Sequence, residues 1–141
     1  MISEFGNNIS NNLSNMLTEI HLNHPSVQIE KVNELRKLDK TLTVFKKLIT
    51  IFHKELTDRI PEMKAACAQE NCSELGRIIH RFKSTTYNLG ASRAVELGKQ
   101  IEHALNKELK SHLEISQLIT LLEHECLAAH ALLVAYLPKD N

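Results

Sequence analysis

The sequence predicts an all-α protein, an antiparallel up-down four-helix bundle with an additional helix at the N-terminus. Apolar residues recur at steps of three or four along almost the whole chain, and no segment of four or more residues alternates like a strand. Short polar connections separate four long periodic stretches, which favours an antiparallel bundle. At 141 residues the chain has the length of about one domain.

The first 38 residues predict a helical extension that precedes the bundle. Residues 1–22 have helical periodicity, His24-Pro25 interrupts it, and a short segment follows with Ile29, Val32, Leu35 and Leu38 on one side. We expect residues 1–38 to pack on or beside a bundle formed by residues 39–141. The apolar face of the first helix could instead form a homodimer, although a monomer is the primary expectation; that face contains Ile2, Phe5, Ile9 and Leu13.

The first bundle helix is expected to begin after Asp39, a good N-cap, and to reach about residue 69. Pro61 lies inside it and removes one backbone hydrogen bond, so we expect a kink or break near Thr57. The apolar stripe of this helix contains Leu42, Phe45, Leu48, Ile49, Phe52 and Leu56.

The second bundle helix should follow the turn QENCS, with Ser73 as its N-cap, and should end at Gly90, because glycine tolerates positive φ. Ser92 is expected to cap a third helix that runs to about Asn106. The polar stretch NKELKSH leads to a last helix that stops at Pro138. The stripe of this last helix contains Ile115, Leu118, Ile119, Leu122, Cys126, Ala129, Leu133 and Tyr136.

Composition argues against several classes of function. Lys plus Arg and Asp plus Glu both number 17, so the basic surplus of a nucleic-acid-binding domain is absent. The nearly apolar run CLAAHALLVAYL is too short to span a bilayer, and no secretory signal begins the chain. Three cysteines without a CxxC pair fit a reducing compartment, and no helical His or Glu-x-x-His ligand pair indicates a metal site. We therefore expect a cytoplasmic protein without a metal, membrane or nucleic-acid partner.

His80 stands out because the helical wheel turns it away from the core. At 100° per residue, Leu89 falls at about 180° from His80, and Ile78 and Phe82 fall within roughly 20° of Leu89. The outward neighbours of His80 are expected to be Ser73, Gly76, Arg77, Lys83, Ser84 and Tyr87.

These outward neighbours leave two interpretations of His80. It can be an ordinary solvated histidine, as most exposed histidines are. It can also be an accessible nucleophile, because small residues stand beside it at Gly76 and Ser84 and cations lie one turn away at Arg77 and Lys83. Positive side chains beside an accessible imidazole favour the transient attachment of a negatively charged phosphoryl group.

Residues 80–91, HRFKSTTYNLGA, resemble the signature of histidine-containing phosphotransfer (HPt) domains, typically H-x-L-K-G-S-S-x-x-L-G-A. The positions that match are His80, Lys83, Leu89, Gly90 and Ala91, with Phe82 as a conservative replacement. The resemblance covers about residues 39–136 and implies an up-and-down four-helix bundle. Upstream, the family's Phe, Leu, Ala and usual Asp correspond to Phe52, Met63, Ala66 and Asn71. Downstream, LGKQIE at residues 97–102 resembles the family's L-x-x-x-L-E segment.

The resemblance implies a role for each residue around His80. His80 would accept a phosphoryl group on Nε2 from a receiver-domain aspartate and pass it to another receiver. Lys83 would neutralise phosphoryl charge, and Glu102 could accept a hydrogen bond from Nδ1 and so fix the tautomer. The catalytic Mg²⁺ and acidic residues would belong to the receiver, so the chain itself would be a phosphocarrier without a cofactor rather than an enzyme.

The partner-binding residues implied around this site are Gly76, Arg77, Ser84 and Tyr87. Ser84 replaces the family's glycine after the lysine, and Tyr87 stands where the family usually has a small residue. Tyr87 can close the end of the bundle or contact the partner. The expected partners are receiver domains of response regulators, a hybrid sensor kinase, or both. An alternative function is a non-phosphorylated helical adaptor that binds a receiver and regulates it, and the chain could also be a module of a larger hybrid kinase.

Overall fold

The computed structural model of the protein describes residues 2–38, 43–107 and 110–137, with side chains described from residue 13 onward. Within these ranges every regular element is a helix and there is no strand, which confirms the predicted all-α class. The helices are α1 (Ile2–Asn23), α2 (Ile29–Leu38), α3 (Thr43–Ala68), α4 (Cys72–Asn88), α5 (Ser92–Lys107) and α6 (His112–Ala135).

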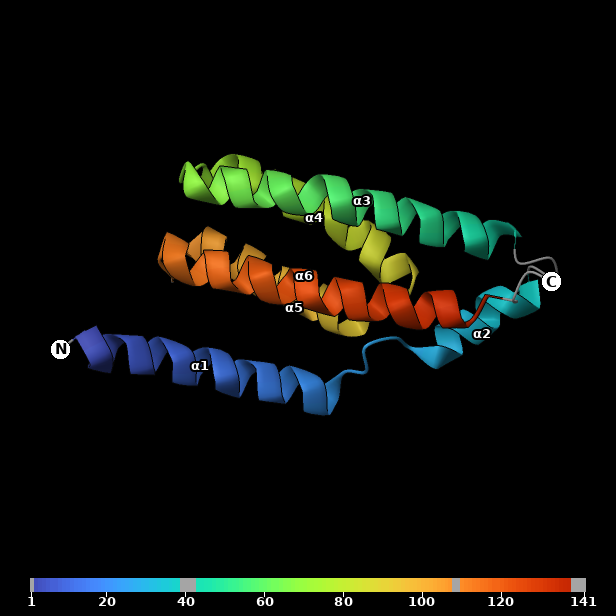
Figure 1. Ribbon diagram of the computed structural model, residues 1–141, viewed down its shortest axis with the longest axis horizontal. Helices are drawn as coiled ribbons and strands as arrows, with labels where there is room; N and C mark the ends of the chain where they lie inside the picture. The colour runs from blue at the N-terminus through green and yellow to red at the C-terminus, as the bar shows by residue number, and fades with distance from the viewer. Residues whose placement is uncertain (1, 39–42, 108–109, 138–141) are drawn as a thin grey trace.

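The last four helices form the bundle. α3 packs against α4 and α6, and α5 packs against the same two helices, so the four enclose one core (Figure 1). Each helix contributes one stripe of buried side chains, as the apolar periodicity predicts. The largest fully buried side chains include Phe45, Phe52, Phe82, Met63, Leu97 and Leu118.

Helix α3 continues without interruption through Pro61, so the break expected near Thr57 is absent (Figure 1). Ile60 is 1% exposed and Met63 is 0% exposed, on the two sides of the proline. Packing of both side chains in the core holds the helix together although the backbone lacks one hydrogen bond at Pro61.

The N-cap of α4 is Asn71 rather than Ser73, because the Asn71 side chain accepts a hydrogen bond from the Glu74 amide. Ser92 does not cap α5 either. It is the first residue of that helix, while the Ala91 carbonyl accepts the Val95 amide and so occupies the cap position. Gly90 has φ +71°, which confirms the conformation expected where α4 ends.

The last bundle helix begins at a capping box that the prediction did not include. The Ser111 side chain accepts from the Glu114 amide, and the Glu114 side chain accepts from the Ser111 amide. The pattern Ser-x-x-Glu was present in the sequence as its signal. Two other predicted boundary residues, Asp39 and Pro138, lie outside the described residues.

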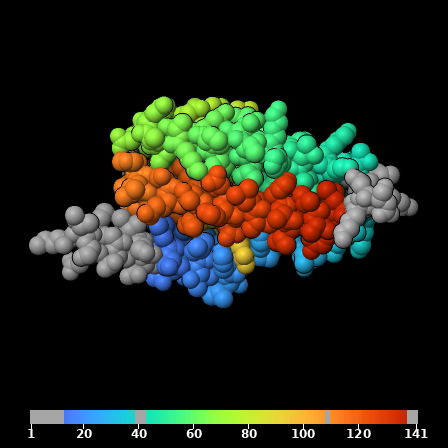
Figure 2. All heavy atoms as spheres, viewed as in Figure 1, coloured from blue at the N-terminus to red at the C-terminus, as the bar shows by residue number. Residues whose placement is uncertain are grey.

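The N-terminal extension shares its core with the bundle. Ile20, Val27 and Val32 belong to the same buried cluster as the bundle stripes. α1 packs against α5, and His21 Nε2 lies 2.8 Å from Glu125 Oε1 in α6. Figure 2 shows the described part of α1 on the same face of the molecule as α6. The boundary between residues 1–38 and 39–141 stays a prediction, as do the monomeric state and the alternative homodimer.

Helix α6 is long and apolar enough, by length and composition, to cross a membrane. The sequence-based estimate considered only residues 126–137, whereas the full helix has 24 residues. In the fold this helix packs against α3 and α5, and one stripe of it is fully buried in the core. The bundle therefore accounts for the buried stripe, whereas Leu113, Leu127, Leu132 and Val134 of the same helix are exposed.

Candidate functional site

Helix α4 places His80 on the outside of the bundle. The His80 side chain is 77% exposed, whereas its neighbour Ile79 is 0% exposed. Leu75, Ile78 and Phe82 are buried against the core on the opposite side of the helix. The outward orientation expected from the helical wheel is confirmed, and His80 is not held in place by packing.

One carboxylate oxygen connects His80 to Lys83. Glu102 Oε1, from α5, lies 3.1 Å from Lys83 Nζ and 3.7 Å from His80 Nδ1. The contact with Lys83 is an ion pair whose angles do not fit a hydrogen bond, and the distance to His80 is too long for one. The structure thus brings together all three residues expected to act on the phosphoryl group, with Nδ1 of His80 toward Glu102.

Gly98 allows Lys83 to reach Glu102. A Cβ atom at Gly98 would lie 3.0 Å from Lys83 Cγ and 3.4 Å from Lys83 Cδ, which is too close without a shift of the lysine. The aliphatic part of Lys83 therefore lies across α5 in the space that a side chain at position 98 would occupy. The sequence analysis did not single out Gly98, although it stands within the quoted segment LGKQIE.

Two hollows flank His80. The first has a volume of about 430 Å³ and is lined, besides His80, by Cys72, Ser73, Gly76, Glu102, Leu105 and Asn106. The second has a volume of about 260 Å³ and is lined, besides His80, by Lys83, Ser84, Tyr87, Asn88, Val95 and Lys99. A Cβ atom at Gly76 would meet only Leu105 Cδ1, at 3.9 Å, so the glycine is not required by packing there. His80 stands on a ridge that a partner can approach from either side.

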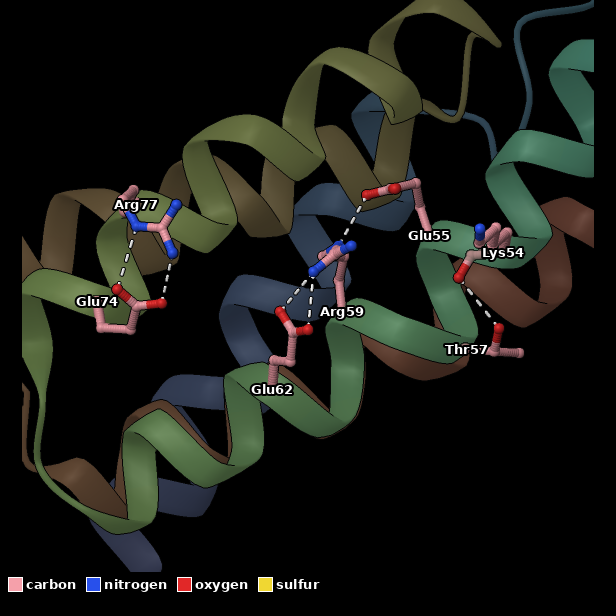
Figure 3. A network of polar contacts seen from close by, with 7 residues as sticks. All are labelled: Lys54, Glu55, Thr57, Arg59, Glu62, Glu74 and Arg77. Atoms are coloured by element: carbon pink, nitrogen blue, oxygen red, sulfur yellow. Dashed lines mark hydrogen bonds and ion pairs between the residues drawn. The ribbon is translucent and has the colours of Figure 1, made fainter.

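Arg77 points away from this ridge. Its guanidinium donates two hydrogen bonds to Glu74, at 2.6 and 3.1 Å (Figure 3). Hydrogen bonding by Arg77 holds the pKa of Glu74 below its ordinary value. Arg77 lines a hollow between α3 and α4 together with Arg59 and Glu62, and it lines neither of the hollows beside His80. Its expected contact with the partner stays a prediction.

Tyr87 is 63% exposed, so it does not close the end of the bundle as a half-buried aromatic. Lys31, from α2, lies over its ring, with Nζ 3.7 Å from the ring centroid. The same ammonium donates a hydrogen bond to the Tyr87 carbonyl at 2.7 Å. The sequence analysis did not find this contact because 56 residues separate its partners.

The remaining histidines and cysteines do not gather into a second site in the described part of the chain. In the described part of the chain, no group of three or more His, Cys, Asp or Glu side chains could hold a metal ion. Cys67, Cys72 and Cys126 are all free, and burial raises the pKa of Cys67 and of Cys126. Burial also lowers the pKa of His130, and nearby His53 adds to the effect. Cys72 is exposed and lines the larger hollow beside His80, whereas Cys67, Cys126 and His130 belong to the core and its edges.

The sequence matches the family model described as Hpt domain over residues 47–132. This range holds 86 residues, from 132 − 47 + 1, which is more than half of the 141 in the chain. The chain belongs to the Hpt domain family. No curated protein and no solved structure matches it. The match includes α4, α5, all but four residues of α3 and most of α6, so it covers every element that surrounds His80.

Membership confirms the resemblance noted in the sequence and supplies the general function. Hpt domains have a histidine phosphotransfer role in phosphorelays and interact with receiver domains of response regulators or hybrid kinases. They are phosphocarriers in two-component signalling. The match does not assign individual residues, so the roles of His80, Lys83 and Glu102 rest on the geometry around His80.

Proposed function

We propose that the protein carries a phosphoryl group between receiver-domain aspartates in a multistep His–Asp relay, with His80 as the phosphoacceptor. The observation that carries the proposal is the exposure of the His80 side chain, 77%, on a ridge between two hollows. Nδ1 lies 3.7 Å from Glu102 Oε1, and we infer that the other ring nitrogen, Nε2, is the one that a receiver meets. The residues beside it are those that phosphoryl chemistry uses: a cation, Lys83, and a carboxylate, Glu102.

The transfer step needs a neutral imidazole with its proton on Nδ1. The lone pair of Nε2 attacks the phosphorus of a receiver's aspartyl phosphate, a P–N bond forms, and the P–O bond to the aspartate breaks. The aspartate leaves as a carboxylate with the bonding electron pair. The developing positive charge on the ring is stabilised by Glu102, whose oxygen lies 3.7 Å from Nδ1 before the reaction. The reverse sequence delivers the group to a second receiver.

Lys83 stabilises the phosphoryl group once it is on His80. Its ammonium lies 3.1 Å from Glu102 Oε1, and Lys83 lines the same hollow of about 260 Å³ as His80. A phosphoryl group adds negative charge beside this ammonium, and charge-assisted contacts of this kind are among the stronger polar interactions in proteins. The Mg²⁺ ion and the acidic groups that orient in-line transfer belong to the receiver. We propose a cytoplasmic location, since the three cysteines are free.

The second candidate is a non-phosphorylated adaptor that binds a receiver and limits its availability. The same exposed ridge would serve it, because binding does not require a nucleophile. The two functions differ only in whether His80 accepts the phosphoryl group.

The test is incubation of the protein with a receiver phosphorylated by a labelled donor. We expect label on the protein that is acid-labile and base-stable, the behaviour of a phosphoramidate bond. The label should be lost in His80→Gln and kept in His103→Gln, a matched control at another exposed histidine. Receiver binding without label in the wild type would overturn the carrier in favour of the adaptor.

A further inference from the structure

The connection between α1 and α2 lies against the turn between α4 and α5. The Gln28 amide donates to the Gly90 carbonyl at 2.8 Å, and Arg93 Nε donates to the His24 carbonyl at 2.8 Å. His24 Nδ1 lies 3.2 Å from Ser92 Oγ. Contacts on both sides of the turn therefore fix the connection, which places the start of α2 beside the end of α4.

Gly90 has a second role in this arrangement. A Cβ atom there would lie 3.3 Å from Gln28 Cβ and 3.4 Å from Lys31 Cβ. Glycine therefore both adopts the positive φ that ends α4 and allows the N-terminal extension to approach the turn closely. The approach brings Lys31 within reach of Tyr87.

Lys31 holds Tyr87 from two directions. Its ammonium donates to the Tyr87 carbonyl at 2.7 Å and lies 3.7 Å from the centre of the Tyr87 ring. A cation over an aromatic face at this distance is attracted to the ring by electrostatics. The side chain of Tyr87 is thus restrained although 63% of the residue is exposed.

Tyr87 lines two neighbouring hollows, together with Val95 and Lys99. One is the hollow of about 260 Å³ that also contains His80 and Lys83. The other is a hollow of about 150 Å³ that also contains His24 and Gln28. Tyr87 therefore joins the surface around His80 to the N-terminal extension.

We propose that the N-terminal extension supports the docking surface for the receiver, because Lys31 fixes the ring of Tyr87 at the edge of the hollow beside His80. The proposal rests on the proposed function, because it concerns the surface that the receiver contacts. Exposed aromatic residues that are already rigid contribute strongly to interfaces, since little side-chain freedom is lost on binding.

The surface indicates the chemistry of the receiver that fits it. The hollow between His80 and Tyr87 has an apolar wall at Val95 and cations at Lys83 and Lys99. A matching receiver presents an apolar patch toward Tyr87 and Val95, and acidic side chains toward the lysines. Lys31 contributes to this match indirectly, through the position of the tyrosine ring.

A purely structural role is the competing explanation, in which Lys31 and Tyr87 only attach the extension to the bundle. The two explanations differ in what a substitution changes. A structural role predicts that loss of Lys31 lowers the stability of the fold and leaves receiver affinity unaltered in the folded protein. A docking role predicts weaker receiver binding by a protein that remains fully folded.

The experiment measures receiver binding by Lys31→Met, Tyr87→Ala and the double variant of the full chain. Methionine keeps the length of Lys31 and removes its charge. Lys37→Met, at an exposed position in the last turn of α2, is the matched control. Circular dichroism and thermal unfolding verify that each variant is folded. Tyr87→Phe, which keeps the ring, is a second control, and Tyr87→Leu, which removes the ring but keeps an apolar side chain, serves if the alanine variant is unstable.

We expect Lys31→Met to weaken binding about two- to fivefold, the range of an exposed cation–π contact. Tyr87→Ala should weaken it more, and the double variant should bind no worse than Tyr87→Ala alone. The Lys37 control and Tyr87→Phe should bind like the wild type. The proposal would be overturned if Lys31→Met bound the receiver with wild-type affinity. It would also be overturned if Lys31→Met weakened binding as much in the Tyr87→Ala variant as it does in the wild type.

Phosphorylation of His80 by the small-molecule donor phosphoramidate separates this proposal from the proposed function. Because phosphoramidate does not dock through Tyr87, Lys31→Met should take the label at the wild-type rate. Failure of wild-type protein to accept phosphoryl from either donor would count against the carrier, whereas binding would still test the docking surface.

Discussion

The two faces of α4 differ in what holds their side chains. On the inward face, Ile79 and Phe82 are 0% and 2% exposed and are fixed by packing from every direction. On the outward face, His80 is 77% exposed, and Glu102 is the one carboxylate within 4 Å of its ring nitrogens in the described part of the chain. Inward substitutions should therefore change stability, and outward substitutions should change transfer while the fold is kept. The experiments below test this division.

The largest effect is expected for Phe82→Ala on the inward face. Removal of a buried phenylalanine should lower the free energy of unfolding by about 3–5 kcal/mol, because the hydrophobic stabilisation from burial of the ring is lost and a cavity remains. Urea denaturation followed by circular dichroism measures the change. Phe82→Leu, the control, should cost less than about 1.5 kcal/mol. A loss below about 1 kcal/mol in the alanine variant would contradict the packing described for this face.

Lys83→Met on the outward face should slow phosphotransfer about tenfold, since one charge-assisted contact to the phosphoryl group is lost. Methionine keeps the aliphatic packing on α5, so the free energy of unfolding should fall by no more than about 1 kcal/mol. Rapid-quench transfer from a phosphorylated receiver measures the rate. An unaltered transfer rate in the variant would show that Lys83 has no role in phosphotransfer. Unfolding of the variant would show that Lys83 has a structural role.

Gly98→Ala should separate stability from transfer most clearly. Alanine in a helix is favoured over glycine by up to about 1 kcal/mol, so stability should stay equal or rise. The new Cβ would lie 3.0 Å from Lys83 Cγ, so the lysine must shift by a few tenths of an ångström, and we expect this shift to weaken its ion pair with Glu102. We expect transfer to slow about twofold, an effect of roughly half a kcal/mol. In the Lys83→Met variant, Gly98→Ala should slow transfer no further. An additive loss of transfer rate would show that Gly98→Ala does not act through Lys83.

The smallest effect concerns His130, a half-buried histidine at the edge of the core. Burial is the main cause that lowers the pKa of His130. His53, whose ring centroid lies 4.8 Å from that of His130, lowers this pKa further. The unfolded chain therefore binds a proton at higher pH than the folded protein does. Stability is retained above the unfolded pKa of about 6.5 and is lost as pH falls below it.

His130→Gln should reduce this acid-induced loss between about pH 7.5 and pH 5.5, measured by urea denaturation at each pH. His53→Gln should reduce it less, because its charge is the smaller of the two causes. If neither variant alters the pH dependence of stability, the assignment of the loss to His130 is wrong.

Local pattern was sufficient for some parts of the site. The helical period alone placed His80 opposite the core, and the need for positive φ placed Gly90 at the end of α4. The choice of N-cap was harder, because Asn71 and Ser73 are both good capping residues two positions apart. The break predicted near Thr57 was wrong, because buried residues on both sides of Pro61 hold α3 together.

The parts that sequence reasoning missed depend on neighbours distant in the chain. Gly98 matters because Lys83 crosses α5 at that point, and Tyr87 is held by Lys31 from another helix. Arg77 is the exception, because Glu74 stands only three residues before it and this local ion pair could have been predicted from the sequence. A helical wheel gives the face of a residue, and only the packed structure gives its partners from distant parts of the chain.

The most direct test of the central claim is to locate the phosphoryl group after transfer from a phosphorylated receiver. Nitrogen-15 and phosphorus-31 NMR at mildly basic pH identifies the residue and the ring nitrogen that carry the group. We predict one phosphoryl group, on Nε2 of His80, with Nδ1 toward Glu102. A phosphoryl group on another residue, or receiver binding without any phosphoryl transfer, would contradict the account.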